Sequence, residues 1–169
     1  MPNLQITHRA LTSEEIDLCI QALKETPNIT GYTKQEWQNF GKVFVAKVNS
    51  ELVAVAVNVE ISKHWEELAV LIVLEKFRGR GLGKKLFNLA LQDILGRKKN
   101  AYTTSRNPIV LNLMKQSGFK FTSLFQLPLP ITFFNLRFIY SLYRLQEFLR
   151  KQKAFPGQPA FEYGVKFYS

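Results

Sequence analysis

The sequence predicts one α/β domain spanning residues 1–169, and three observations lead to this fold class. The length suits a single domain, which at this size buries roughly 70% of the surface that its unfolded chain exposes. The composition, 46% hydrophobic and 21% charged, is that of a soluble globular protein. Helical segments and β-branched apolar runs alternate along the chain, without a linker, a repeat or a low-complexity tract.

The N-terminal third predicts a strand, two helices and a hairpin. Leu4 to Ala10 alternates weakly between apolar and polar residues and is expected to be the first strand. Thr12 to Glu15 and Thr33 to Glu36 both have the S/T-x-x-E form of a capping box, so a helix is expected at each. Runs of β-branched residues flank the polar pair Asn49-Ser50, which predicts a β-hairpin.

The middle of the chain predicts a central strand followed by two helices. Trp65 to Leu74 is apolar on both faces near its end, which is typical of a strand inside a sheet. A helix with an apolar stripe is expected over residues 81–96, between two glycines. After a short strand at Ala101 to Ser105, the Asn-Pro pair that opens the segment 107–117 predicts a capped helix.

The C-terminal part predicts a strand, a helical segment and a closing strand. Phe119 to Phe125 is expected to be extended, as is the end of the chain, residues 161–169. Between them, residues 128–153 have helical periodicity after two prolines. Their apolar stripe consists of Phe134, Phe138, Leu142, Leu145 and Leu149. We expect this stripe to pack in the core or in a dimer interface; a lid and a membrane-surface helix are the alternatives.

Positive charge is concentrated in the second half of the chain. Residues 1–71 carry 6 Lys/Arg against 9 Asp/Glu, whereas residues 72–169 carry 17 against 4. Such an imbalance attracts anions, whether a phosphorylated cofactor, nucleic acid or an acidic membrane surface.

The few cysteines and histidines favour neither a disulfide nor a metal site. Cys19 is the single cysteine, and His8 and His64 are the two histidines, so no metal is expected. Cys19 stands between apolar neighbours in a predicted helix, which favours a buried side chain over a nucleophile. The N-terminus lacks the apolar core of a signal peptide, and the apolar runs are of strand length. We expect a cytoplasmic protein.

Glycine and positive charge coincide in the stretch FRGRGLGKKL, Phe77 to Leu86, directly after the central strand. Its spacing does not fit G-x-x-x-x-G-K-[ST], because Arg78 stands at the first glycine position. It does not fit G-x-G-x-x-G either, because the third glycine is Gly83 instead of residue 84. What remains is a glycine-rich turn whose backbone N–H groups are expected at the positive end of a helix. Such a turn is suited to binding a pyrophosphate.

Two segments carry a resemblance to a known family. Arg78-Gly79-Arg80-Gly81-Leu82-Gly83 resembles the R/Q-x-x-G-x-G/A acyl-CoA pyrophosphate loop of the GNAT N-acyltransferase superfamily. Asn107 to Phe119 resembles that family's later N-x-x-A-x-x-L-Y-x-x-x-G-F segment in order and length. The resemblance covers about Leu52 to Phe125.

This resemblance implies a fold and an activity. The fold is a single GNAT-like domain with a mixed, mostly antiparallel twisted sheet of about six to seven strands flanked by helices. The helical segment 128–153 is then an extra element before the last strand. The implied activity is transfer of an acetyl group from acetyl-CoA to a primary amine by direct attack in a ternary complex. The amine belongs to a small molecule or to a protein lysine or N-terminus.

The resemblance also implies cofactor-binding residues. The pyrophosphate would lie against the loop formed by Arg78, Gly79, Arg80, Gly81, Leu82, Gly83 and Lys84. The end of the preceding strand, at Val73 and Leu74, would pair with the pantetheine arm. Asn107 would approach the pantetheine or its thiol end, although capping of the following helix explains this residue equally well.

The family often uses a carboxylate on the central strand as the general base. The candidates here are Glu60, Glu66, Glu67 and, more weakly, His64. Adjacent strand residues point to opposite faces, so at most one of Glu66 and Glu67 faces the site. Where the family commonly has a tyrosine as proton donor, this chain has Met114, which cannot donate a proton. The general acid is therefore left unassigned, with Tyr102, Thr104, Ser105, water or unassisted departure of the thiolate as alternatives.

Two other functions compete with the enzyme. A non-catalytic acyl-CoA-binding or regulatory domain on the same fold is favoured by Met114. A nucleic-acid-binding module is suggested by the basic C-terminal part, but the chain contains no recognised nucleic-acid motif. A homodimer remains an open alternative.

Overall fold

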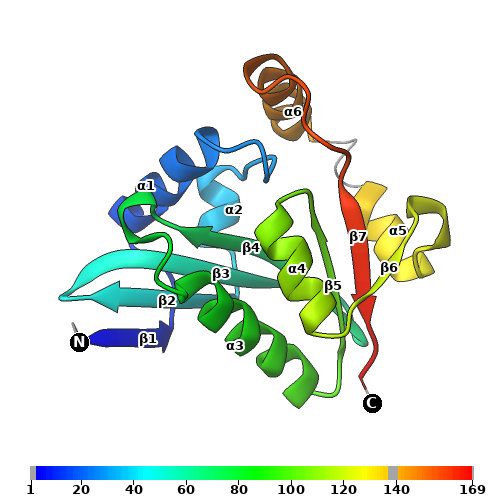
Figure 1. The fold of residues 1–169 in the computed structure, drawn as a ribbon, viewed down its shortest axis with the longest axis horizontal. Coiled ribbons are helices and arrows are strands. Elements are labelled where there is room, and N and C mark those ends of the chain that lie inside the picture. Colours follow the sequence, from blue (N-terminus) through cyan, green and yellow to red (C-terminus); the bar gives the residue numbers. More distant parts are fainter. Residues whose placement is uncertain (1–2, 137–140, 169) are drawn as a thin grey trace.

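The computed structural model describes residues 3–136 and 141–168 (Figure 1). Within these residues, seven strands form one sheet in the order β1-β2-β3-β4-β5-β7-β6. Neighbouring strands are antiparallel except β4 and β5, which are parallel. The strands are β1 Leu4–His8, β2 Lys42–Val48, β3 Glu51–Ser62, β4 Trp65–Val73, β5 Asn100–Ser105, β6 Lys120–Thr122 and β7 Glu162–Lys166. The predicted fold class, a mixed and mostly antiparallel sheet flanked by helices, is confirmed.

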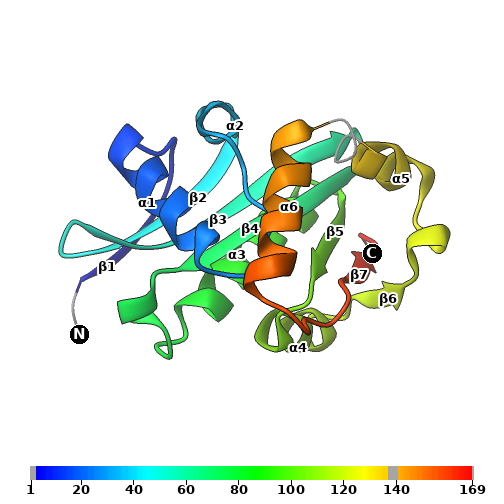
Figure 2. The same ribbon diagram turned by 90° about the horizontal axis from the view of Figure 1, so that it is seen from above.

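Helices cover both faces of this sheet. The described helices are α1 Ser13–Lys24, α2 Lys34–Gln38, α3 Leu82–Gly96, α4 Pro108–Gln116, α5 Leu129–Leu136 and α6 Leu142–Ala154. One hydrophobic core joins α3 and α4 to the sheet, and a second joins α1 and α2 to the opposite face. A third, smaller cluster packs Ile131 of α5 against Tyr102 and Val165. Seen from above, α6 lies between the α1–α2 side and α5 (Figure 2).

Local sequence signals explain the early elements. In each predicted capping box the threonine side chain accepts a hydrogen bond from the glutamate amide, and the glutamate carboxylate accepts one from the threonine amide. Asn49 and Ser50 adopt positive φ angles of 50° and 68°, which suits the tight turn of the β2–β3 hairpin. Cys19 is fully buried in α1, and burial, together with the charge of Glu15, raises the pKa of its thiol to about 12. The buried, non-nucleophilic interpretation of Cys19 is supported.

Two predictions on the C-terminal part need correction. The strand expected over Phe119 to Phe125 is limited to β6, and a 3-10 turn, Leu124–Gln126, follows it. β6 is short because it lies at the edge of the sheet and pairs only with the five-residue β7. The helical segment 128–153 forms two helices, α5 and α6, on either side of residues 137–140, which lie outside the described part.

Three residues in the apolar stripe of this segment do not pack in the core, and packing in a dimer interface stays a prediction. Leu142, Leu145 and Leu149 of α6 are 70%, 42% and 54% exposed, so core packing is wrong for these three. Phe134 is partly buried and lines a cavity, and Phe138 lies outside the described residues. Leu142, Leu145 and Leu149 have the helical spacing that the sequence predicts, but α6 turns a different, partly polar face toward α1 and α2.

Candidate functional site

The sheet opens between its two parallel strands. β4 and β5 pair only at Trp65–Asn100, Glu66–Ala101 and Glu67–Tyr102. At the next level the Thr103 hydroxyl donates a hydrogen bond to the Leu68 carbonyl oxygen (2.9 Å). Beyond that bond the strands diverge, and a cavity of about 790 Å³ lies at the opening. It is lined by the ends of β4 and β5, the turn before α3, and one side of α4.

The glycine-rich turn forms one wall of this cavity. Gly79 and Gly81 have φ angles of +76° and +75°, a conformation that disfavours other residues. The first helical bond of α3 is from the Lys85 amide to the Gly81 carbonyl, so the amides of residues 82–84 precede it and remain available to an anion. The backbone therefore has the glycine turn at the start of a helix that the sequence predicts, and binding of an anion there stays a prediction.

The predicted cofactor residues divide into two groups. Those that line the cavity are Val73, Arg78, Gly79, Gly81, Leu82, Gly83, Lys84 and Asn107. Two others do not: Arg80 stacks over the Phe77 ring (5.4 Å to its centroid), and the Leu74 amide donates to the Val53 carbonyl (3.0 Å). The splayed strand end thus presents Val73 alone of the predicted pair.

Asn107 and Met114, both in the segment 107–119, lie in different environments. The Asn107 side chain accepts a hydrogen bond from the Ile109 amide (2.9 Å) and also lines the cavity, so capping and ligand contact are compatible. Met114 is fully buried, and its Cε lies 2.5 Å from where a Cβ on Gly164 would stand. This side chain packs against β7 instead of lining the cavity.

A second cavity, of about 630 Å³, adjoins the first. It lies on the sheet face that carries Glu67 and Tyr102, and α5, α6 and the loop between α1 and α2 complete its walls. The two cavities share four lining residues: Asn28, Ile29, Ala69 and Thr104. Ala69 is a bulge in β4, because the β3 register passes from Leu68 directly to Val70. The two cavities therefore meet at this bulge.

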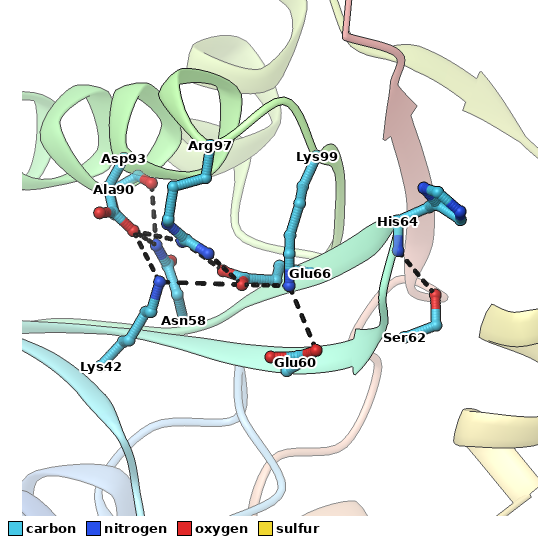
Figure 3. Close-up of polar contacts among 10 residues, drawn as sticks. All are labelled: Lys42, Asn58, Glu60, Ser62, His64, Glu66, Ala90, Asp93, Arg97 and Lys99. Carbon is cyan, nitrogen blue, oxygen red and sulfur yellow. Dashed lines mark hydrogen bonds and ion pairs between the residues drawn. The ribbon is translucent and has the colours of Figure 1, made fainter.

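The four candidate bases lie in different surroundings. Glu66 has no exposed surface and lies between Arg97 (2.6 Å, Nη2 to Oε2) and Lys99 (3.1 Å), with Lys42 at 3.9 Å (Figure 3). Burial opposes ionisation of this carboxyl, but Arg97 and Lys99 outweigh it and lower its pKa. Glu60 is 63% exposed at its side chain and pairs with Lys99, and His64 is exposed in the β3–β4 turn.

Glu67 alone of these candidates lines the second cavity. It is 8% exposed and pairs in register with Tyr102 of β5. Burial and the nearby Glu67 charge raise the pKa of the Tyr102 phenol, so this hydroxyl stays protonated at neutral pH. Asn135 of α5 donates to the same hydroxyl (3.0 Å). The strand alternation predicted from the sequence holds, and it separates Glu66 from Glu67.

Helix α6 is held across the second cavity by polar contacts. Arg144 pairs with Glu36 of α2 (2.6 Å) and lies over the Tyr32 ring (4.7 Å to its centroid). Lys151 is buried and donates to the carbonyls of Leu23 (2.5 Å) and Ile29, and burial lowers its pKa to about 8. These contacts join α6 to α1, to α2 and to the loop between them.

Of the four residues at the junction of the two cavities, the sequence singled out Thr104 as a possible proton donor and missed the other three. Ala69 carries no side-chain signal, and its bulge follows from the β3–β4 register, which only the paired strands reveal. Asn28 and Ile29 stand in a segment that reads only as a helix break. Among the described residues there is no cluster of three or more His, Cys, Asp or Glu side chains suited to a metal ion. No helix in the same part of the chain is long and apolar enough to cross a membrane.

Comparison with known structures shows where this fold recurs. An N-acetylglutamate synthase from Neisseria gonorrhoeae, solved with coenzyme A and N-acetyl-glutamate, aligns with a TM-score of 0.68 at 15% identity, covering 98% of this chain and 35% of that one. This chain thus spans about a third of that enzyme. A Mycobacterium tuberculosis protein solved in complex with CoA gives a TM-score of 0.66 at 12% identity, covering 95% and 98% of the two chains.

A third likeness has higher sequence identity. An IAA acetyltransferase from Bacillus cereus is 25% identical, with a TM-score of 0.55 and coverage of 72% of this chain and 79% of that one. A sequence search of curated proteins finds no match. The family model described as "Acetyltransferase (GNAT) family" matches residues 11–119, which include the glycine-rich turn, the diverging strands and Asn107. The chain belongs to the acetyltransferase (GNAT) family.

Proposed function

We propose that this protein transfers the acetyl group of acetyl-CoA to a primary amine in a ternary complex. The observation that carries the proposal is the junction of the two cavities, which share Ala69, Thr104, Asn28 and Ile29. A thioester at the end of the first cavity would meet an amine in the second, and no covalent enzyme intermediate is required. We further propose a cytoplasmic location, which the single buried cysteine supports.

The first cavity suits the CoA moiety. The amides of residues 82–84 and the cations of Arg78 and Lys84 line this cavity, and we propose that they bind the pyrophosphate. The diverging edge at Val73 leaves room for the pantetheine arm to lie along β4. Structures of two proteins with the same fold contain CoA.

The chemistry we propose assigns Glu67 as the general base. The acceptor nitrogen attacks the thioester carbonyl, Glu67 takes the proton that the amine loses, and the thiolate of CoA leaves. A backbone group of the bulged residue Ala69 is available for the carbonyl oxygen, because a bulge frees a residue from the ladder. A thiol pKa of about 8.5 allows the thiolate to depart without a side-chain acid.

Two lysines in the first turn of α3 provide the test of cofactor binding. Lys84 lines the first cavity, whereas Lys85 is exposed and is not one of its lining residues. Lys84→Glu and Lys85→Glu change the charge equally at the same helix end, so the helix-dipole and net-charge effects match. In calorimetric titrations with CoA, we expect Lys84→Glu to weaken binding about tenfold relative to Lys85→Glu. Equal affinities, or no binding by wild type, would remove the proposed cofactor site.

A non-catalytic acyl-CoA-binding domain is the second candidate. The observation that favours it is the burial of Met114 against β7, so that this position supplies no proton donor. Thiol release from acetyl-CoA in the presence of a broad amine panel separates the two functions. Tight CoA binding without turnover of any amine would support the binding domain.

A further inference from the structure

We propose that the acceptor is a primary amine carried on an apolar body, an alkyl chain or an aromatic group, held in the second cavity. This inference rests on the proposed function and specifies its acceptor. It follows from the lining of the cavity and from the small number of charges that the lining contains.

The walls of the second cavity are mainly apolar and aromatic. Seven aromatic side chains line it: Tyr32, Tyr102, Phe125, Phe134, Phe148, Phe161 and Tyr163. The apolar lining continues outward to the protein surface, where Leu129 is 71% exposed and Phe125 is 97% exposed. Exposed apolar side chains that continue from a cavity favour a ligand with an apolar body that reaches from the interior to the rim.

Charged side chains are few in this lining. Glu67 and Arg144 are its only Asp, Glu, Lys or Arg residues among the part of the chain that the structure describes. Arg144 already pairs with Glu36 (2.6 Å) and stacks on Tyr32, so it holds α6 in place. Among the described lining residues, Glu67 carries the carboxylate that an ammonium group entering the cavity would meet.

This charge pattern disfavours two common kinds of acceptor. Among the lining residues that the structure describes, Arg144 is the one Lys or Arg, and it is already paired with Glu36, so an amino acid with acidic groups finds no unpaired cation among them. A diamine or polyamine would bring a second ammonium to an apolar cavity whose described lining holds a single carboxylate. A ligand with one ammonium group at Glu67 and an apolar remainder against the aromatic wall fits both the charge and the apolar surface of the lining.

The test is a series of n-alkylamines from butylamine to octylamine, with putrescine and L-glutamate as comparators. Binding is measured calorimetrically to the protein saturated with CoA, and acetylation is measured with acetyl-CoA. Each added methylene is expected to tighten binding about threefold to fourfold until the cavity is filled. Because binding is measured directly, the result does not depend on turnover.

Neighbouring phenylalanines of α5 provide the matched variants. Phe134 lines the cavity, whereas Phe133 is 69% exposed and is not one of the lining residues. Phe134→Ala is expected to weaken octylamine binding about tenfold or more and to flatten the chain-length dependence, and Phe133→Ala to leave both unchanged.

The outcomes separate this inference from the proposed function. CoA binding together with affinity that does not rise with chain length, or with preference for putrescine or L-glutamate, overturns the apolar acceptor and leaves the acetyltransferase intact. Failure of CoA to bind refutes the proposed function itself. Chain-length-dependent binding without acetylation keeps the apolar amine site and favours the non-catalytic domain.

Discussion

Glu66 and Glu67 are neighbours in β4, but their carboxylates lie on opposite faces of the sheet and in opposite environments. On the α3 side, Glu66 is fully buried and surrounded by Arg97, Lys99 and Lys42. On the other side, Glu67 faces a cavity with largely apolar walls and lies next to Tyr102. The cations near Glu66 stabilise its charge and leave no room for a substrate, whereas Glu67 lies where a ligand can reach it.

The comparison teaches that burial of a carboxylate does not by itself indicate catalysis. Glu66 is the more buried of the two and has a lowered pKa, yet its ion pairs connect β4 to the end of α3. A general base needs access to the reacting atom first and a suitable pKa second. Of the four candidates, only Glu67 lines the second cavity, and this is why we propose it as the base. The predictions below test this division of roles, beginning with the largest expected effect.

Glu67→Gln is expected to lower kcat about 100- to 10,000-fold, the usual range for removal of a general base. The isosteric amide keeps the shape of the side chain, so CoA affinity should change little. Steady-state kinetics between pH 7 and 10 provide a further readout. Without its base, the variant's rate depends on the fraction of the amine that is already neutral in solution. The residual rate should rise toward high pH, and a wild-type rate at pH 7 would exclude Glu67 as the base.

Glu66→Gln is expected to lower the free energy of unfolding by about 2–4 kcal/mol, since it leaves Arg97 and Lys99 without their buried partner. The value falls below the full penalty for a buried pair because these cations are themselves partly exposed. Urea unfolding measures the loss. The folded variant should retain acetyl transfer, and a selective loss of kcat with unchanged stability would reverse the assignment of the two residues.

Met114→Tyr, which introduces the residue common in the family, is expected to destabilise the protein by about 1–3 kcal/mol without raising kcat. Met114 is fully buried against Gly164, so a larger side chain must displace its neighbours. Thermal unfolding and kinetics measure the two effects, with Met114→Leu as the volume-conserving control. A gain in kcat would mean that this position reaches the first cavity after all.

The pH dependence of the free energy of unfolding should also reveal the environment of Glu66, with a smaller expected effect. Because the folded-state pKa of Glu66 is lowered, its contribution is present above the unfolded-state pKa, near 4.3, and is lost as the pH falls further. The stability gap between wild type and Glu66→Gln should therefore narrow below about pH 4.5, by at most about 1.4 kcal/mol per pH unit. A gap that stays constant between pH 7 and pH 3 would contradict the lowered pKa.

The sequence predicted most of the elements because their signals are local. Both capping boxes, the Asn49-Ser50 turn and the Asn107 cap depend on residues within a few positions of one another. The glycine turn was equally readable, since positive φ angles at Gly79 and Gly81 demand that residue type. The C-terminal part was predicted less well, because β6 depends on its pairing with β7, and α6 depends on contacts with residues more than a hundred positions away.

The sequence by itself determined the family, the glycine-rich turn before α3 and the fact that Glu66 and Glu67 lie on opposite faces of one strand. Each of these follows from spacing along the chain, which the period of a strand or the geometry of a turn converts directly into structure. Only the tertiary structure decided which of the two carboxylates faces a cavity and which is surrounded by cations. The cations on one side and the bulge at Ala69 beside the other are set by how distant strands and helices pack, and neither leaves a local signal in the sequence.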